Sequence, residues 1–439
     1  MKPHRLTILA LGGILIVAMG IIARLGDLAR KTPLLLLLWG LAHAAYVAGA
    51  WLVLRRPGTD RARLPIILAC GLLARILLLP SAPTLSEDVY RYLWDGHLVA
   101  HGVNPFPHAP SDPALAPYRN DLLRHLNHAD VPTIYPPLAQ LLFASTAAIS
   151  ETPLAWKLML LALETILVLA VLRLLRNRGL PRERLLLYYW NPLVLVESFG
   201  SGHVDLAAAA LLLLSLWLYE ERRAARAGIT FALAVLTKLF PAILIPWLVG
   251  RRAGILLVTA AITAAILYAP FVPAGSTLWT GLTIYARHWE FNGALYHLLH
   301  HVVASEESIR RILAALFAVA SILIAWRAGT APQAAFLGLV AFLLLSPTVF
   351  PWYLVPVVAL LPLYPDAGMI AFSGLVALSY LPLPAYHATG TWSLPGWILR
   401  VEYGGLIAAW ATASALRARV RQRENAHVEE SEEVQGEEG

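Results

Sequence analysis

Adjacent carboxylates at Glu87 and Asp88 stand near the start of a stretch, residues 86–96, that is dense in ionisable and aromatic side chains. A carboxylate held beside a hydroxyl can act as a general base, and a pair of carboxylates can also bind a cation. At helical spacing, Glu87 could instead form an ion pair with Arg91 on a solvated surface. The stretch and the turn after it also carry residue types typical of sugar binding: Tyr90, Tyr92, Trp94, Asp95 and Asn104.

A single cation, Lys238, lies within a long apolar run and is followed closely by Pro241. An ionisable residue inside a membrane segment is a functional hypothesis by default. A lone ammonium in a medium of low dielectric favours an anion, so Lys238 could bind a phosphate. The alternative is that its long side chain reaches the nearer interface without a chemical role.

Two further groups could contact a substrate. His203 and Asp205 follow two glycines in residues 200–205, and glycines allow a backbone to approach a ligand closely. These two side chains could bind a phosphate, sugar hydroxyls or a metal, or they could simply form a helix turn with a capping aspartate. Arg287 and His288 could contact an anion or lie in an ordinary exposed loop.

The motifs of nucleotide-driven and metal-dependent catalysis are absent from the sequence. It contains no Walker-type loop, dinucleotide fingerprint, GxSxG, HExxH or EF-hand motif. The histidine pairs at 125/128 and 300/301 have no companion ligands at the spacing of a known metal site. We therefore expect no metal and no cofactor, and we expect any activated donor to arrive through the membrane.

The composition indicates that the candidate site residues are positioned by membrane helices. Of 439 residues, 58% are hydrophobic and 14% are charged, whereas soluble domains have about 25% charged residues. We predict an all-α polytopic membrane protein. The net charge of +7 is concentrated in short loops between apolar runs, which indicates membrane topology rather than nucleic-acid binding.

Many apolar runs approach the length of about 20 residues that spans a bilayer. We predict about 11–14 membrane helices in one domain, residues 1–418, with the first run retained as a signal anchor. The predicted spans are residues 6–23, 33–54, 64–79, 154–175, 185–199, 206–219, 255–271, 309–326, 334–345, 352–363, 367–381 and 403–416.

Basic loops set the expected orientation. Arginine-rich segments at 55–63, 173–184, 220–223 and 251–252 and after residue 416 predict that these loops and both termini are cytoplasmic. Residues 81–135 and 272–307 then form two large extracytoplasmic loops. The acidic tail, residues 419–439, is predicted to be cytoplasmic and disordered.

Two apolar segments, 137–150 and 227–249, would break this alternation if each crossed the membrane once. We predict that the first is re-entrant or interfacial, because it is short. The second is interrupted at residues 238–241, so we predict two half-length helices that enter and return, with Lys238 at their tip.

Four pieces of the chain resemble a known family. Residues 86–96 (SEDVYRYLWDG) with 102–106 (GVNPF) resemble the first-loop signature of bacterial polyprenol-phosphate-dependent mannosyltransferases, members of the GT-C superfamily of membrane glycosyltransferases. Shorter similar pieces are residues 135–138 (YPPL), residues 202–205 (GHVD) followed by 238–241 (KLFP), and residues 350–353 (FPWY). The resemblance extends over roughly residues 60–370. The order of the four pieces along the chain carries more weight than any one of them.

The resemblance implies a GT-C-like bundle in the cell (inner or plasma) membrane. Its implied activity is transfer of a hexose, by family default mannose, from a polyprenyl-phosphate donor to a hydroxyl of a lipid or glycan acceptor. Transfer would occur on the extracytoplasmic face with inversion. The position that matches the family's catalytic acid is Asp88, and whether Asp88 or Glu87 acts as the base stays open.

The resemblance also implies roles for the remaining candidate residues: some would bind the phosphate of the donor, and others would bind the sugar or the acceptor. The candidates to stabilise the leaving phosphate are Lys238, Arg91, His203 and Arg287. Asp205 and His288 join the aromatic and polar residues of the first loop as candidates to bind the sugar or the acceptor. A second hypothesis is a transporter or flippase for a lipid-linked or small polar solute, but transporters usually carry paired inverted repeats, which we do not find here.

Overall fold

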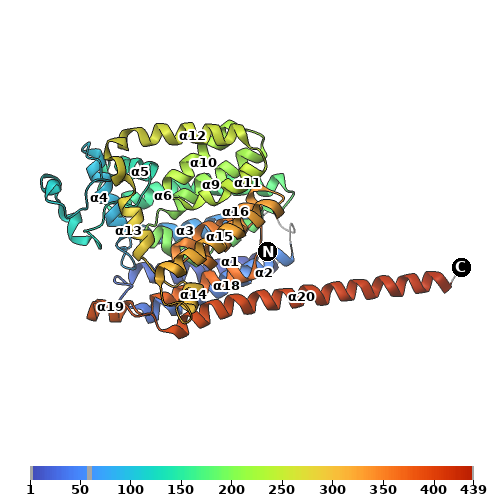
Figure 1. Cartoon of the computed structure of the whole chain (residues 1–439). Helices are drawn as coiled ribbons and strands as arrows, with labels where there is room; N and C mark the ends of the chain where they lie inside the picture. Colours follow the sequence, from blue (N-terminus) through green and yellow to red (C-terminus); the bar gives the residue numbers. More distant parts are fainter. Residues whose placement is uncertain (1–2, 57–61, 438–439) are drawn as a thin grey trace.

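The structure, a computed structural model, describes residues 3–56 and 62–437, so residues 57–61 of the predicted basic loop lie outside the described residues. The described residues form helices and no strand, and their one β-type contact is an isolated bridge region between Phe291–Asn292 and Thr348. The helices run roughly along a common axis in one bundle (Figure 1). The prediction of an all-α polytopic membrane protein is confirmed.

Within the described residues, six helical segments are long and apolar enough to cross a membrane. They are Arg5–Arg24, Thr32–Arg55, Pro153–Asn177, Gly254–His288, Glu306–Arg327 and Ala367–Thr389. This length criterion selects fewer segments than our predicted 11–14, because other apolar runs form shorter or broken helices. For example, the run after residue 182 divides at Pro192 into α7 (Leu186–Tyr189), α8 (Pro192–Leu195) and the π-helical η4 (Val196–Ser201).

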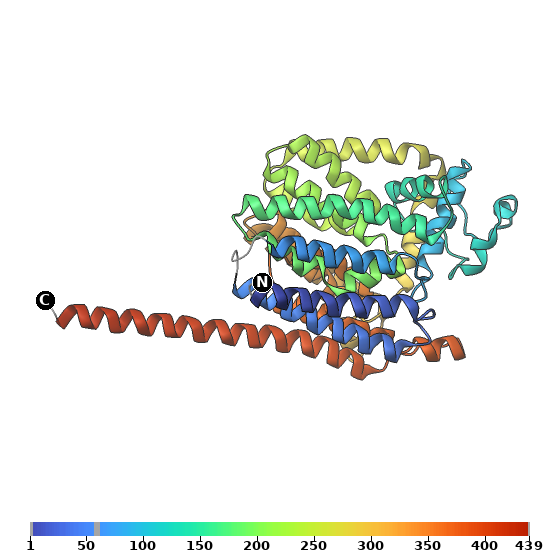
Figure 2. The same cartoon turned by 180° about the vertical axis from the view of Figure 1, so that it is seen from behind.

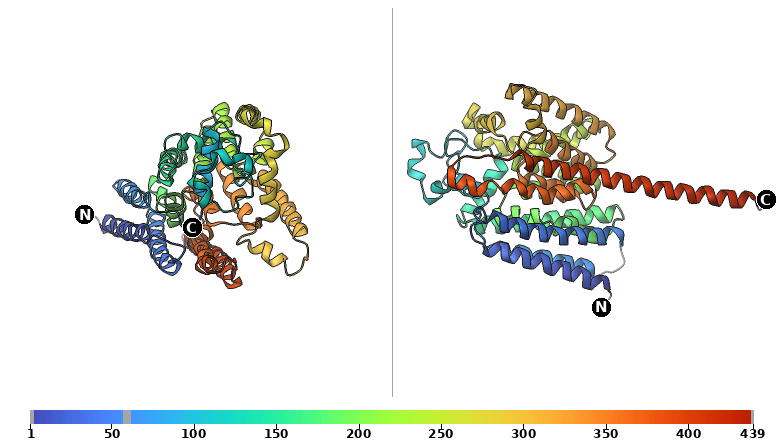
Figure 3. Two further views of the ribbon diagram at one scale, coloured as in Figure 1. Left: turned by 90° about the vertical axis from the view of Figure 1, so that its left-hand side faces the viewer. Right: turned by 90° about the horizontal axis from the view of Figure 1, so that it is seen from below.

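The bundle has two chemically different ends. One end, which we call the loop end, carries α4 (Asp88–Ala100), α5 (Pro137–Ala147) and α13 (Thr280–His288) (Figure 1). The opposite end, which we call the basic end, carries the arginine-containing loops 177–184, 220–223 and 250–253. Viewed along the helices from the loop end, the N-terminal helices lie on one side and α12, α13 and α15 on the other (Figure 3).

Hydrogen bonds join the loops of the basic end. Arg178 Nη2 donates to Glu220 Oε1 at 2.6 Å, and Arg251 Nη2 donates to the carbonyl oxygen of Ala328 at 2.8 Å. Arg178 Nη2 also donates to Thr330 Oγ1 at 3.4 Å, which links the two pairs. These loops are far apart in sequence, so the bonds place them together at one end of the bundle. The basic segments therefore gather on one side, as the charge pattern indicated.

The helix α5 does not cross the bundle. Just before it, Thr133 Oγ1 donates to Asp95 Oδ2 of α4, and just after it, Glu151 Oε1 lies 2.5 Å from His97 Nδ1, also on α4. Both ends of α5 therefore lie at the loop end, which agrees with the prediction of a short, non-spanning segment.

The predicted pair of half-length helices is also present. α10 (Ala224–Thr237) ends at Lys238, whose backbone is extended at φ −157° and ψ 140°. The chain then continues as η5 (Phe240–Leu244) and α11 (Ile245–Gly250). Pro241 lies in η5, and a proline cannot supply the N–H that a continuous helix needs there.

Contacts of Trp247, in α11, show that this segment returns to the basic end. Its ring centroid lies 5.9 Å from that of Tyr219, near the end of α9 (Asp205–Glu220), and its Nε1 donates to Ala328 at 2.9 Å. The two halves therefore start and finish at the same end, and Lys238 lies at the tip between them.

A buried ion pair connects two helices of the N-terminal half. Arg75, in α3 (Arg63–Leu78), donates from Nε and Nη2 to both carboxylate oxygens of Glu164, in α6 (Pro153–Asn177), at 2.5 and 2.6 Å. Tyr188 Oη donates to the same carboxylate at 2.8 Å, and the two charged side chains are 0% and 2% exposed. This bidentate pairing joins α3 and α6 inside the bundle.

The last helix, α20 (Gly396–Glu437), is 42 residues long and projects beyond the basic end (Figures 1 and 2). We predicted disorder for residues 419–439, whereas the backbone is helical through Glu437. The segment is rich in Glu and Arg, which have high intrinsic helix propensity and can extend the helix.

Candidate active site

The packing of α4 on α5 positions the predicted carboxylates. A Cβ at Gly96 would lie 2.4 Å from the carbonyl oxygen of Phe143, so only glycine lets the two helices approach this closely. One turn earlier on the chain, the Tyr92 ring stacks on Phe143 with centroids 4.7 Å apart and meets Tyr135 edge-on at 5.0 Å. The first turn of α4, with Asp88, is thereby held against the bundle.

Asp88 faces the interior of the bundle. Tyr92 Oη donates to Asp88 Oδ2 at 3.5 Å, and His203 Nδ1 lies 3.6 Å from the same oxygen. The Asp88 side chain is 27% exposed, but its surroundings exclude much of the solvent. Burial raises the pKa of Asp88 to about 6, partly opposed by the positive charge of Lys238 and reinforced by the negative charges of Asp205 and Glu87.

Glu87 turns the other way. It precedes the first residue of α4, and Asn127 Nδ2, in the 81–135 segment, donates to its Oε2 at 3.3 Å. The two neighbouring carboxylates therefore diverge, one toward the bundle interior and one toward the outer segment.

Lys238 and Asp205 form a close pair at the centre of the site. Lys238 Nζ donates to both oxygens of Asp205, at 2.8 and 2.7 Å, and also lies 4.6 Å from the centroid of the Tyr353 ring. Asp205 begins α9 and is 1% exposed, whereas Lys238 is 21% exposed. The break between α10 and η5 thus brings its cation to the N-terminus of α9.

His203 lies between Asp88 and a second buried acid, Glu197. Its Nε2 is 3.4 Å from Glu197 Oε2, and its ring stacks on Trp352 with centroids 3.7 Å apart. Gly202 has a φ of 84°, a left-handed conformation that favours glycine and allows the chain to turn from η4 into α9. Sequence reasoning missed Glu197, although an acidic residue in an apolar run could have indicated it.

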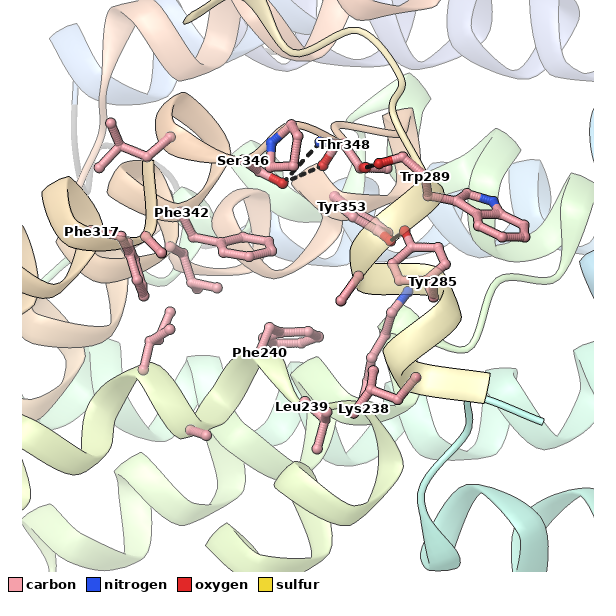
Figure 4. A pocket seen from close by; sticks show the side chains of 18 of the residues that line it. Lys238, Leu239, Phe240, Tyr285, Trp289, Phe317, Phe342, Ser346, Thr348 and Tyr353 are labelled. Carbon is pink, nitrogen blue, oxygen red and sulfur yellow. Dashed lines mark hydrogen bonds between the residues drawn. The ribbon is translucent and has the colours of Figure 1, made fainter. Parts of the chain in front are cut away.

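A cavity of about 750 Å³ opens beside these residues (Figure 4). Its polar part contains Asp205, Lys238, Tyr285 and Tyr353, and in Figure 4 the Lys238 amine points toward the two tyrosines, whose hydroxyls form a hydrogen bond. Most of the lining is apolar and comes from η5, α11, α15 and α16 (Ala331–Leu345), and it includes Leu239, Phe240, Ile243, Leu313, Phe317 and Phe342.

Arg310, in α15 (Glu306–Arg327), is a second cation of this cavity. Its Nη1 donates to the carbonyl oxygens of Ala286, at 3.3 Å, and Trp289, at 3.0 Å, at the end of α13. Sequence reasoning missed Arg310 because it opens a predicted span, where an arginine is ordinarily interfacial. Arg310 is far along the chain from the motifs at residues 86–96 and 238–241, so the sequence does not indicate that it lies near them.

Arg91 and Asp95, predicted to bind phosphate and sugar, are instead paired with each other. Arg91 Nε donates to Asp95 Oδ1 at 2.9 Å, while Asp95 Oδ2 accepts hydrogen bonds from Thr133 and from Gln140 at 3.3 Å. The i,i+4 ion pair on α4 is therefore Arg91–Asp95 and not the Glu87–Arg91 pair that we considered. Its contacts join α4 to α5 and do not face the cavity.

Other predicted binding residues also lie outside the cavity. Trp94 is fully buried in a small apolar cluster of the 81–135 segment, and Asn104 Nδ2 donates to the carbonyl oxygen of Phe271 at 3.3 Å. Tyr90 stacks on a histidine of the same segment at 4.6 Å. Arg287 and His288 are exposed at the end of α13. Of the predicted residues, the structure brings together Asp88, Tyr92, His203, Asp205 and Lys238.

Comparison with known proteins identifies the family. Residues 11–254 match the family model described as alpha-(1->6)-mannopyranosyltransferase, N-terminal domain. A search of curated proteins found no match. The matched region contains α4, His203, Asp205 and Lys238, whereas α13, α15 and α16, which complete the cavity, lie beyond it. Because the match covers more than half of the chain and includes the assembled site, the protein belongs to the alpha-(1->6)-mannopyranosyltransferase family.

Proposed function

We propose that the protein transfers mannose from a polyprenyl-phosphate-linked donor to a hydroxyl of a lipid or glycan acceptor. The observation that carries this proposal is that Asp88 interacts electrostatically with Lys238 and Asp205. Asp88 itself does not line the cavity, but these two residues belong to the polar part of its largely apolar lining. A lipid-linked sugar matches this arrangement part by part. Its apolar chain would face the apolar lining, its anionic phosphate the cations, and the reacting anomeric carbon of its sugar would face Asp88.

The cavity lining supports a lipid donor. Side chains of η5, α15 and α16 offer an apolar surface to a polyprenyl chain, and burying apolar area contributes roughly 25 cal/mol per Å². Lys238 and Arg310 supply positive charge for the phosphate. Lys238 already pairs with Asp205. The described hydrogen bonds of Arg310 go to neutral carbonyl oxygens, and its guanidinium lies 5.2 Å from the centroid of the Tyr296 ring.

The chemistry then needs few groups. The Asp88 carboxylate accepts the proton of the acceptor hydroxyl while the hydroxyl oxygen attacks the anomeric carbon. The bond to the phosphate oxygen breaks, and polyprenyl phosphate leaves with the electron pair, stabilised by the cations. One displacement inverts the anomeric configuration, so an α-linked product requires a β-linked mannosyl phosphate.

The charge distribution supports an extracytoplasmic site in the cell membrane. The basic loops gather at the end of the bundle opposite Asp88, and basic loops are retained on the cytoplasmic side. A site on the other face has no access to nucleotide sugars, and a lipid-linked donor can reach it.

The test is transfer by the purified protein. Mannosyl-phosphoryl polyprenol and a short α-mannoside acceptor should yield free polyprenyl phosphate and an extended mannoside, and Asp88→Asn should yield neither while remaining folded. Product formed from a nucleotide-activated mannose, and not from the lipid donor, would overturn the donor assignment. Movement of intact donor across proteoliposomes without product would instead establish a transporter.

A further inference from the structure

A buried series of polar groups lies behind Asp88. From Asp88 Oδ2, it passes through His203, with Nδ1 at 3.6 Å, to Glu197 Oε2, which is 3.4 Å from Nε2. It ends at Tyr380, whose Oη donates to Glu197 Oε1 at 2.8 Å. Neither ring nitrogen of His203 nor Oε2 of Glu197 has a hydrogen-bond partner among the described residues. Their nearest charged or polar neighbours are each other and Asp88, so the imidazole stands between two carboxyl groups.

The positions of these groups are strongly constrained. Glu197 and His203 are 0% and 1% exposed. The imidazole stacks on Trp352 with an interplanar angle of 13°, and the backbone N–H of His203 donates to the carbonyl oxygen of Glu197 at 2.9 Å. The ring has little freedom to move, so the variable that remains is which of its two nitrogens carries the proton.

That choice depends on Glu197. A neutral imidazole has one donor and one acceptor nitrogen. If Glu197 were ionised, Nε2–H would donate to it, and the lone pair of Nδ1 would face the lone pairs of the Asp88 carboxylate. If Glu197 keeps its proton, it donates to Nε2, and Nδ1–H then points at Asp88 Oδ2.

The environment favours the second arrangement. An ionised carboxylate buried without a cation is costly, and the nearby cation, Lys238, is held by both oxygens of Asp205. Tyr380 donates to Oε1 of Glu197, which leaves Oε2 to carry the proton toward Nε2. Ser201 also lies beside this carboxyl, and its hydroxyl can accept as well as donate.

We propose that Glu197 is a positioning residue that keeps its proton and donates it to His203 Nε2. This donation selects the tautomer whose Nδ1–H holds Oδ2 of Asp88 and favours the ionised base. Oδ1 of Asp88 then remains available to the acceptor hydroxyl. This role of Glu197 rests on the proposed function of Asp88 as the base. It adds His203 and Glu197 as the groups that keep Asp88 ionised.

The test compares Glu197→Gln with Glu197→Met. A glutamine amide reproduces one acceptor for Tyr380 and one donor for His203, so transfer should stay within a few-fold of wild type with an unchanged pH profile. Methionine has a similar size but neither group. It should lower kcat about ten-fold, leave the KM for the donor unchanged and move the acidic limb up by about one pH unit, the scale of one lost hydrogen bond to a charged group.

The other charged groups around Asp88 are the same in both variants. They are Glu87 before α4, Asp205 at the start of α9 and Lys238 after α10. A shift of the limb in Glu197→Met alone therefore reports the state of His203. If Glu197→Met fails to fold, His203→Phe, which keeps a ring against Trp352, should show the same upward shift.

Two results would overturn the proposal. Equal loss of activity in Glu197→Gln and Glu197→Met would mean that Glu197 acts as an ionised proton acceptor. Reduced activity in Glu197→Met without a shift of the limb would mean that its contribution is only structural. Failure of the proposed function itself would be seen separately, as wild-type rates in Asp88→Asn.

Discussion

The rate of mannosyl transfer should fall as the pH is lowered through about 6. Burial raises the pKa of Asp88 from its usual 3.8 to about 6, and a general base works only in its ionised form. Asp88 is then about nine-tenths ionised at pH 7 and about one-tenth ionised at pH 5, which predicts a rate loss of about ten-fold between these values.

The neighbours of Asp88 give this prediction internal controls. The negative charge of Glu87 helps to raise the Asp88 pKa, so Glu87→Gln should retain transfer and move the acidic limb to slightly lower pH. Asp88→Asn preserves shape and removes the base. Its rate should fall by about 10²–10⁴-fold at pH 7, the usual contribution of general base catalysis, and its pH profile should lack the acidic limb of the wild type.

The assay is single-turnover release of polyprenyl phosphate by purified protein between pH 5 and pH 8, which isolates the transfer step from product release. A rate that is flat between pH 5 and pH 7 would refute the assignment of Asp88 as the titrating base. Loss of activity in Glu87→Gln together with an active Asp88→Asn would transfer the catalytic role to Glu87.

Four further substitutions test other parts of the structure. Arg310→Gln should raise the KM for the lipid donor about ten-fold or more, because a hydrogen-bonding cation is lost from the cavity. Asp95→Ala should lower stability by about 3 kcal/mol, since it leaves Arg91 without its carboxylate, and this should be seen as a lower midpoint of thermal unfolding in detergent. Arg75→Met should cost about 3–5 kcal/mol in the same measurement, because it strands a buried carboxylate. Gly96→Ala should cost about 1–3 kcal/mol and reduce transfer, because its methyl group separates α4 from α5.

A matched control for both arginine variants is Arg311→Gln. Arg311 and its partner Glu307 are 76% and 75% exposed, so the loss of this pair should change the stability by less than about 1 kcal/mol. An unchanged donor KM in Arg310→Gln would contradict the phosphate role. Unfolding midpoints for Arg75→Met or Asp95→Ala that match Arg311→Gln would contradict the energetic importance of those buried pairs.

The helix boundaries near the site could be predicted because their causes are local. The half-length pair around Lys238 follows from Pro241 and from basic loops on both sides. The short length of α5 and the alternation of charge were enough to predict that it stays at one end.

The pairing of charged side chains could not be predicted in the same way. Arg91 has an acidic residue four positions away in each direction, and sequence spacing alone allows either pair. The structure pairs it with Asp95, because Thr133 and Gln140 from a separate segment surround that carboxylate. The choice depends on long-range packing.

The sequence by itself determined the class of protein, the order of its helices, the end at which the basic loops gather and the motif that contains Asp88. These follow from hydropathy, loop charge and proline positions, which act over a few turns of chain. Only the tertiary structure decided which polar residues meet. It brought Glu197 behind His203 and placed Arg310 in the cavity with Lys238. Asp88 and His203 are far apart along the chain, as are Lys238 and Arg310, and local patterns carry no information about such distances.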